Sequence, residues 1–236
     1  MNSLNMILAV SDLTQIGLYI LYILVPLLVL YVGYLILTKA FRYMGFSSLE
    51  AIIIVFISFI FGFDIVIYGF NISNVYLFSY DNWRVGVNIG GAVLPVLLSV
   101  YLIYKKKLSL KKVIIGVAVV TVIAFLVTNP DPTKGIISHF PFWLLPAFSA
   151  SIVSITLLWK EFRKAAPLAY ISGTLGVLIG ADFLHLPSLL NATISKPTNA
   201  VIGGAVVFDM IYITGILAVI VDGIIMFKQR SREKID

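Results

Sequence analysis

The sequence predicts an all-α integral membrane protein of about seven transmembrane helices, forming a single membrane domain over residues 1–236. Three observations lead to this fold class. Hydrophobic residues make up 60% of the chain and charged residues only 12%, whereas soluble domains carry about 25% charged residues. Apolar runs recur at a length close to the roughly 20 residues that a helix needs to cross a bilayer. Lysine and arginine are concentrated in alternate connections, as in a membrane topology.

The apolar runs define the predicted helices in chain order. Backbone groups in lipid are satisfied only within helices or closed barrels, and the alternating polarity of barrel strands is absent, so each run is predicted to be a helix. The fourth run is the shortest, and whether it spans fully is left open. The seven segments are 16–38, 49–70, 87–104, 113–128, 140–159, 167–186 and 201–227.

The positive charges predict how the chain is oriented. All but three of the 17 Lys and Arg residues lie in the first, third and fifth connections or in the tail, the exceptions being Arg84, Lys134 and Lys196. The positive-inside rule then places the N-terminus outside and the C-terminus in the cytoplasm, in a multi-pass protein of the cell membrane. Because topology explains the net charge of +6, the sequence predicts no nucleic-acid partner.

Four short motifs recur in the same order, at offsets between 113 and 121 residues. We interpret 16–104 and 140–227 as two copies of a three-helix unit, with 113–128 as the linker helix between them. This three-plus-one-plus-three architecture resembles that of SWEET-type transporters, without their sequence motifs. The recurring motifs are L-V-P at 24–26 and L-L-P at 144–146, K-A-F-R at 39–42 and K-E-F-R at 160–163, G-F-D at 62–64 and G-A-D at 180–182, and I-G-G-A-V at both 89–93 and 202–206.

The duplicated glycines have two interpretations. Small residues let helix backbones approach closely in lipid, so both glycine pairs are first expected to be packing surfaces. Close backbone approach also serves ion and substrate sites, which makes the same glycines candidates for substrate binding. The two pairs are Gly90 with Gly91 and Gly203 with Gly204.

Aspartates within the apolar segments are the strongest functional signal. Asp64, Asp182 and Asp209 are expected at a similar depth in the outer half of the bilayer, where each costs roughly 2.5–3.5 kcal/mol unless it is neutral, paired or hydrated. Asp64 and Asp182 are counterparts in the duplication, whereas Asp209 is present only in the second copy. We therefore predict that Asp182 and Asp209 form a proton-binding or catalytic dyad, with Asp64 assisting in substrate binding. The alternative is that each makes a structural hydrogen bond between helices.

Other polar groups receive lesser roles. Asp222 is expected near the cytoplasmic end of its helix, where it reaches the interface or pairs with the basic tail, as a structural group. His185 lies three residues after Asp182 and so shares its helix face, as a further substrate-binding candidate. A metal site made from these aspartates with His185 and His139 is an alternative, but no metal is predicted. No cofactor is expected, because there are no cysteines, only two histidines and no nucleotide-binding motif.

The second half resembles a known family. The patterns G-T-L-G-x-L-I-G-A-D at 173–182 and I-G-G-A-x-x-F-D-x-I-x-x-T-G-I at 202–216, with 88–104 also fitting, are similar to an uncharacterised prokaryotic membrane family, domain of unknown function 1614. The resemblance implies a polytopic membrane protein and no established activity. A degraded likeness to intramembrane aspartyl proteases rests on G-A-D at 180–182 and F-D at 208–209; the motif order is reversed and no P-A-L follows.

Three functions remain open at this point. The first is a proton- or cation-coupled transporter or permease of a small solute, with the site between the two halves. The second is an intramembrane hydrolase that uses Asp182 and Asp209 on a membrane peptide. The third is a non-catalytic scaffold or subunit. The expected partners are the lipid bilayer and a small solute or membrane peptide, and a homo-oligomer is left open.

Overall fold

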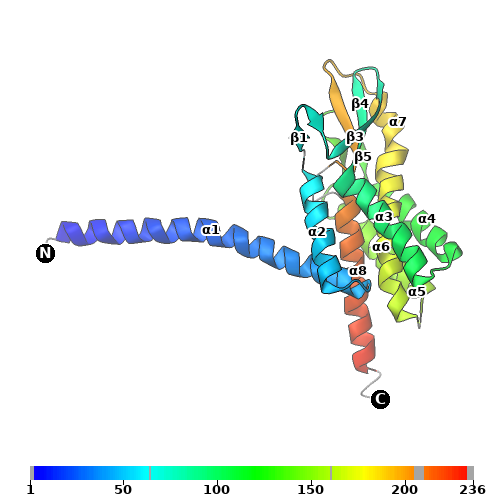
Figure 1. Cartoon of the computed structure of the whole chain (residues 1–236), viewed down its shortest axis with the longest axis horizontal. Coiled ribbons are helices and arrows are strands. Elements are labelled where there is room, and N and C mark those ends of the chain that lie inside the picture. The colour runs from blue at the N-terminus through cyan, green and yellow to red at the C-terminus, as the bar shows by residue number, and fades with distance from the viewer. Residues whose placement is uncertain (1–2, 64, 160, 205–209, 233–236) are drawn as a thin grey trace.

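The computed structural model describes residues 3–63, 65–159, 161–204 and 210–232. Over these residues the chain is mostly helical, and a helical bundle carries small β-sheets at one end (Figure 1). The helical elements are α1 (Ser3–Tyr43), α2 (Ser48–Gly62), η1 (Ile89–Val93), α3 (Leu94–Lys106), α4 (Leu110–Val127), η2 (Phe142–Leu144), α5 (Leu145–Leu157), α6 (Phe162–Val177), η3 (Leu178–Phe183), α7 (Leu184–Leu190) and α8 (Met210–Arg232). The strands are β1 (Val66–Ile67), β2 (Phe70–Asn71), β3 (Asn74–Tyr80), β4 (Trp83–Asn88), β5 (Asn129–Asp131), β6 (Gly135–Ile137) and β7 (Thr198–Ile202).

Membrane-spanning capacity is confirmed for part of the predicted set. Within the described residues, four helical stretches are long and apolar enough to cross a bilayer: Gly17–Tyr43, Ile89–Lys106, Leu110–Val127 and Arg163–Leu190. Three further apolar helices, in α2, α5 and α8, are shorter. These helices indicate a membrane protein. The seven crossings, the orientation and the duplicated architecture stay predictions.

The strands correct the all-α prediction. Parts of three apolar runs that were expected to be helical, at 49–70, 87–104 and 201–227, instead form β1, β2, β4 and β7. These stretches are rich in β-branched and aromatic residues, which favour strands, and the Asp81–Asn82 turn allows β3 and β4 to pair as a hairpin. The period-two pattern is present in β4, from Trp83 to Asn88, but it is short and is followed directly by an apolar helical run.

The sheets lie together at one end of the bundle, which we call the sheet end (Figure 1). β3 pairs antiparallel with β4, and β4 pairs parallel with β7, so that Val87 lies opposite Ile202. β1 with β2, and β5 with β6, form two separate antiparallel pairs. The parallel pairing places the chain before the first I-G-G-A-V directly beside the chain that enters the second.

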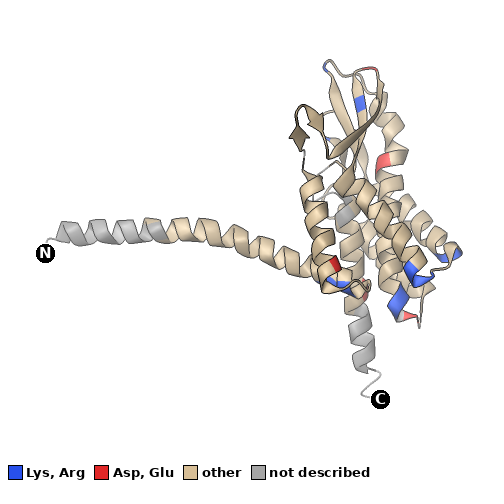
Figure 2. Cartoon of the chain, viewed as in Figure 1, with Lys and Arg blue, Asp and Glu red and all other residues tan. Residues whose placement is uncertain are grey.

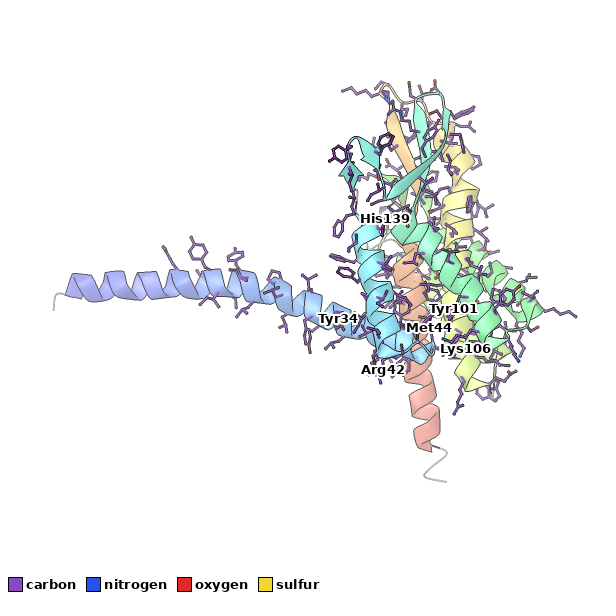
Figure 3. All side chains as sticks on the ribbon, in the orientation of Figure 1. Tyr34, Arg42, Met44, Tyr101, Lys106 and His139 are labelled. Carbon is purple, nitrogen blue, oxygen red and sulfur yellow. The ribbon has the colours of Figure 1, made fainter. Side chains whose placement is uncertain are left out.

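The opposite end of the bundle carries most of the positive charge, and we call it the basic end. Figure 2 shows Lys and Arg gathered at the α1–α2, α3–α4 and α5–α6 connections. At the sheet end, Arg84 lies in β4, Lys134 between β5 and β6, and Lys196 between α7 and β7. Figure 3 places Met44, Tyr101 and Lys106 near the basic end, where the side-chain amino group of Lys105 lies over the Tyr101 ring at 4.9 Å. The charge segregation predicted from sequence is therefore present in the fold.

Helix α1 stands apart from the bundle. It points away from the other helices (Figure 1), and its apolar stretch Gly17–Tyr43 has a mean hydropathy of 2.6 with no buried residues in its most apolar part. Among the described residues of α1, those near its C-terminal end pack on the bundle: Ala40 and Phe41 are fully buried, and Leu37 is partly buried against the same core. α1 therefore joins the bundle at the basic end and does not pack along α2 and α3 as a compact three-helix unit would.

Close contacts between helices are made at glycines in the bundle interior. α6 packs against α4, α5 and α8. A Cβ at Gly116 of α4 would overlap Ser172 of α6, and a Cβ at Gly215 of α8 would overlap Thr174 of α6. Small residues permit this approach, which in lipid is driven by packing. The interior therefore contains many buried hydroxyl groups beside its apolar side chains.

Candidate functional site

Two helices at the sheet end contain a π-helical turn. η1 consists of the first I-G-G-A-V, and η3 contains Gly180, Ala181 and Asp182 between α6 and α7. π-turns are rare and occur frequently at functional sites. η1 begins where the Asn88 side chain accepts a hydrogen bond from the Gly91 N–H at 2.7 Å, while its amide donates to Asn74 Oδ1 at 2.8 Å. Asn88 is itself buried, so this cap is fixed on both sides.

The first I-G-G-A-V and the described residues 202–204 of the second adopt different conformations and contact each other. The first is the π-helical turn, whereas in the second Ile202 ends β7 and Gly203 turns the chain with φ +68°. A Cβ at Gly91 would overlap the Gly203 carbonyl oxygen, and a Cβ at Gly203 would lie 2.7 Å from the Ala92 Cβ. One glycine from each predicted pair, Gly91 and Gly203, therefore packs on the other. The positive φ at Gly203 is a second reason for glycine there.

Asp182 lies directly beside this contact. Its carboxylate oxygen Oδ2 accepts a hydrogen bond from the Gly203 N–H at 2.9 Å, and its side chain is half-buried. The carboxylate therefore ties the π-turn between α6 and α7 to the turn that follows β7. A hydrogen bond to an ionised acceptor is stronger than a neutral one.

A cavity of about 360 Å³ opens next to Asp182 at the sheet end. One wall is β7 with the turn after it, another is the β5–β6 hairpin, and the third is the η3–α7 helix. Trp83 closes one side and is held there because its indole N–H donates to the Ala192 carbonyl at 3.2 Å. The cavity combines apolar walls with a few polar groups, as small-molecule sites do. Its polar lining residues include Asp182, Lys134, Thr128, Thr133 and Asn199.

The β5–β6 hairpin presents Thr133 and Lys134 to the cavity through a tight turn. Asp131 Oδ1 accepts hydrogen bonds from the Thr133 hydroxyl at 2.6 Å, the Thr133 N–H at 2.8 Å and the Lys134 N–H at 3.0 Å. The Thr133 hydroxyl first, and then these two N–H groups, hold the pKa of Asp131 below its ordinary value. This hairpin was not predicted from the sequence, although Asn-Pro-Asp-Pro at 129–132 with a glycine at 135 is a recognisable turn signal.

Neither histidine joins the cavity in this structure. His185 is buried, its ring stacks on Phe125 with centroids 4.5 Å apart, and its Nε2 lies 3.1 Å from the Phe125 carbonyl oxygen. The residues around the cavity include Asp182 but not His185, so its ring is directed to α4. His139 is exposed, between β6 and η2 (Figure 3).

The remaining predicted site residues divide into two groups. Asp64 and Asp209 lie outside the described residues, so the predicted dyad of Asp182 with Asp209 stays a prediction. Gly90 is buried against α2, where an added Cβ would lie 2.7 Å from the Ser58 carbonyl oxygen. Gly204 is exposed and lines the cavity with Gly203. Gly90 is thus a helix-packing position, whereas Gly203 and Gly204 are at the cavity.

A family model described as "Protein of unknown function (DUF1614)" matches residues 65–221. The chain belongs to this family. The match covers η1, η3, β7 and the cavity, and leaves out α1 and α2, so the family is defined by the part of the bundle that builds the site. No curated protein and no solved structure matches the chain. The comparisons give no support to the likeness to aspartyl proteases.

The position of the Asp222 side chain differs from the one predicted from the sequence. Asp222 of α8 was expected to reach the membrane interface or the basic tail, but its side chain is fully buried, and Ser154 Oγ of α5 lies 3.3 Å from its Oδ1. Sequence position gave its depth along the helix and not the face on which it lies. Among the described residues, no three His, Asp or Glu side chains are grouped closely enough to hold a metal ion.

Proposed function

We propose that this chain is a multi-pass transporter of the cell membrane that binds a small polar solute in the cavity beside Asp182. One observation carries the proposal: a half-buried carboxylate, at a π-helical interruption of a long apolar helix, borders a cavity of about 360 Å³. Intramembrane carboxylates are costly and are functional by default. Transporters commonly bind solutes where a transmembrane helix is interrupted.

The charge distribution indicates which side of the membrane the cavity faces. If the basic end faces the cytoplasm, as the positive-inside rule requires, the sheet end and its cavity face outward. Asp182 is then a recognition group for the positively charged part of a solute arriving from outside. Lys134 on the opposite wall is a group of the other sign, so a solute that carries both charges also fits.

The Gly91–Gly203 contact supports a role for both halves of the chain. η1 belongs to the first predicted copy and β7 to the second, and they meet at the wall of the cavity. A solute bound between Asp182 and the 203–204 turn would therefore contact the region where the two halves pack together, and its binding would depend on how they are packed. Rocking of two repeats about a fixed site is how such transporters alternate access. Coupling to a proton or another cation is assigned to Asp182 and Asp209.

Reconstitution into proteoliposomes tests the proposal. Uptake of primary amines, amino acids and sugars is measured with and without an imposed proton gradient, for wild type, Asp182→Asn and Asp209→Asn. We expect wild type to accumulate at least one solute class and Asp182→Asn to lower its uptake at least about tenfold, because a charge-assisted contact is lost. Asp81→Asn, in the exposed β3–β4 turn, is the matched control and should transport normally.

The same preparations separate the other two hypotheses. Cleavage of membrane peptides that is lost in both aspartate variants would instead identify a hydrolase. Wild-type protein that is folded but has neither activity would favour the scaffold and overturn the transport proposal.

A further inference from the structure

Asp222 is a buried carboxylate that the cavity does not include. It lies on α8, next to Gly223, against which the Tyr43 ring packs at the basic end. None of its side-chain surface is exposed. Its Oδ2 atom has no hydrogen-bond partner among the described residues, and its Oδ1 atom has the Ser154 hydroxyl at 3.3 Å. A buried polar atom without a partner in the described part of the chain calls for a physical reason.

The hydrogen bonds of Ser154 indicate which group carries a proton. Ser154 Oγ lies 2.9 Å from the Ser151 carbonyl and 3.3 Å from Asp222 Oδ1, but a hydroxyl has only one proton to donate. Ser151 in turn donates its own proton to the Ala218 carbonyl at 2.6 Å. Both contacts are satisfied at once if Asp222 is protonated. The carboxyl O–H then donates to Ser154 Oγ, and the Ser154 hydroxyl donates to the Ser151 backbone carbonyl.

None of the described cations on the neighbouring helices forms an ion pair with Asp222. The helices α1, α5 and α6 pack against α8. Lys39 and Arg42 of α1 and Arg163 of α6 are exposed. Lys164 of α6 pairs with Glu161 at 2.8 Å. α5 carries no ionisable side chain.

Two phenols face this side of the bundle. The Tyr43 ring packs at Gly223, and the Tyr170 ring packs at Gly215. A phenol supplies no positive charge. An ionised carboxylate buried with no cation beside it among the described residues is far more costly than a neutral one, so these surroundings also favour the protonated form.

Buried hydroxyls extend from Asp222 toward the sheet end. Thr214, Ala218 and Asp222 are spaced four residues apart, so they share one face of α8, and all three are buried. At about 1.5 Å per residue, Thr214 lies roughly 12 Å along the helix from Asp222. The hydroxyls of Thr214 and of Thr174 on α6 are buried and have no hydrogen-bond partner among the described residues. They supply unused donors and acceptors between Asp222 and the level of η3.

We propose that Asp222 is a reversible proton-binding site inside the bundle, held by Ser154, with the buried hydroxyls of Thr214 and Thr174 lying toward the sheet end. Binding forms an O–H bond at the carboxylate as the proton leaves a hydronium ion, which becomes water, and release reverses this. The site does not depend on the chain being a transporter. In a transporter it is a proton site separate from the solute cavity at Asp182.

Infrared difference spectroscopy of the purified full chain in lipid tests the proposal. A protonated carboxyl has a carbonyl-stretch band that the carboxylate lacks. We expect wild type to show this band at low pH and to lose it as the pH is raised, and Asp222→Asn to lack that pH-dependent component. Asp131→Asn, in an exposed turn, should keep it. A wild-type difference spectrum unchanged in Asp222→Asn, or a band that persists at every pH, would show a fixed structural hydrogen bond and overturn the proposal.

Ser154→Ala keeps the test valid if Asp222→Asn does not fold. This variant retains the carboxyl but removes its hydrogen-bond partner, so the pH-dependent band should move to higher frequency. Thr156→Ala, whose hydroxyl is exposed and bonds only to its own helix through the Ile152 carbonyl at 2.7 Å, is the control and should leave the band in place. An identical band position in both variants would also overturn the assignment.

Discussion

Gly91 packs against the carbonyl of Gly203, so that the two copies of I-G-G-A-V meet at the wall of the cavity beside Asp182. The contact joins residues more than a hundred positions apart in the chain. Because the first copy is π-helical and the second follows a strand, the identical sequences are not used symmetrically. Gly91 of the first copy packs behind Gly203 of the second, and Gly203 and Gly204 line the cavity.

Substitution at either glycine should weaken this contact. Gly91→Ala places a methyl group on the Gly203 carbonyl, and overpacking of this kind costs about 1–3 kcal/mol. Gly203→Ala should cost more, because it adds strain at a positive φ to a Cβ only 2.7 Å from Ala92. Thermal unfolding in detergent measures both. Gly33→Ala, where an added Cβ meets nothing within 4 Å, should not lower the unfolding temperature; an equal loss in all three variants would contradict this account.

The Asn88 cap should be the anchor of η1. Asn88→Ala removes the acceptor for the Gly91 N–H and leaves that buried donor unpaired, which costs about 1–3 kcal/mol. Asn88→Ser keeps a hydroxyl oxygen that accepts from the same N–H, so its stability should fall between alanine and wild type. Denaturant or thermal unfolding ranks the three proteins. Equal stability of the serine and alanine variants would mean that the cap contributes little.

The β5–β6 turn should loosen in acid. The Thr133 hydroxyl and the two backbone N–H groups lower the pKa of Asp131 in the folded chain. Its stabilising effect is therefore complete above the unfolded-state pKa of about 3.9 and is lost as pH falls through the lower folded-state value. Hydrogen exchange of the Thr133 and Lys134 amides, corrected for intrinsic rates, measures this. Exchange should be faster in Asp131→Asn at neutral pH and fastest in Asp131→Ala, because asparagine keeps a neutral acceptor and alanine keeps none, and wild type should approach the asparagine variant in strong acid.

His185 should contribute to stability and not to solute binding. His185→Ala removes the ring stacked on Phe125 and leaves the Phe125 carbonyl without this partner, at a cost of about 1–3 kcal/mol. His139→Ala, at an exposed position, should be close to wild type in thermal unfolding. Solute affinity should be unchanged in both variants. A lowered affinity in His185→Ala with unchanged stability would restore the role predicted from sequence.

The sequence predicted well those properties that depend on composition and position along the chain. Apolar length indicates which stretches can cross lipid, and the segregation of lysines and arginines follows from the order of the connections. Asp182 was selected because a carboxylate in an apolar segment is costly wherever the helix lies. The strands were missed for two reasons. β3 and β7 lack a regular alternation of polar and apolar residues, and β4, which does alternate from Trp83 to Asn88, is only six residues long and runs directly into an apolar helix.

The sequence by itself therefore determined that the chain has apolar helices, a charged end and an unusual carboxylate, since each of these follows from local chemistry. Tertiary structure decided which surfaces meet. It gave I-G-G-A-V one conformation where Asn88 caps it and another where Asp182 holds Gly203. It turned His185 to Phe125, and it buried Asp222 against Ser154. Sequence position fixes the depth of a residue along its helix, but only packing fixes the partner that its side chain finds.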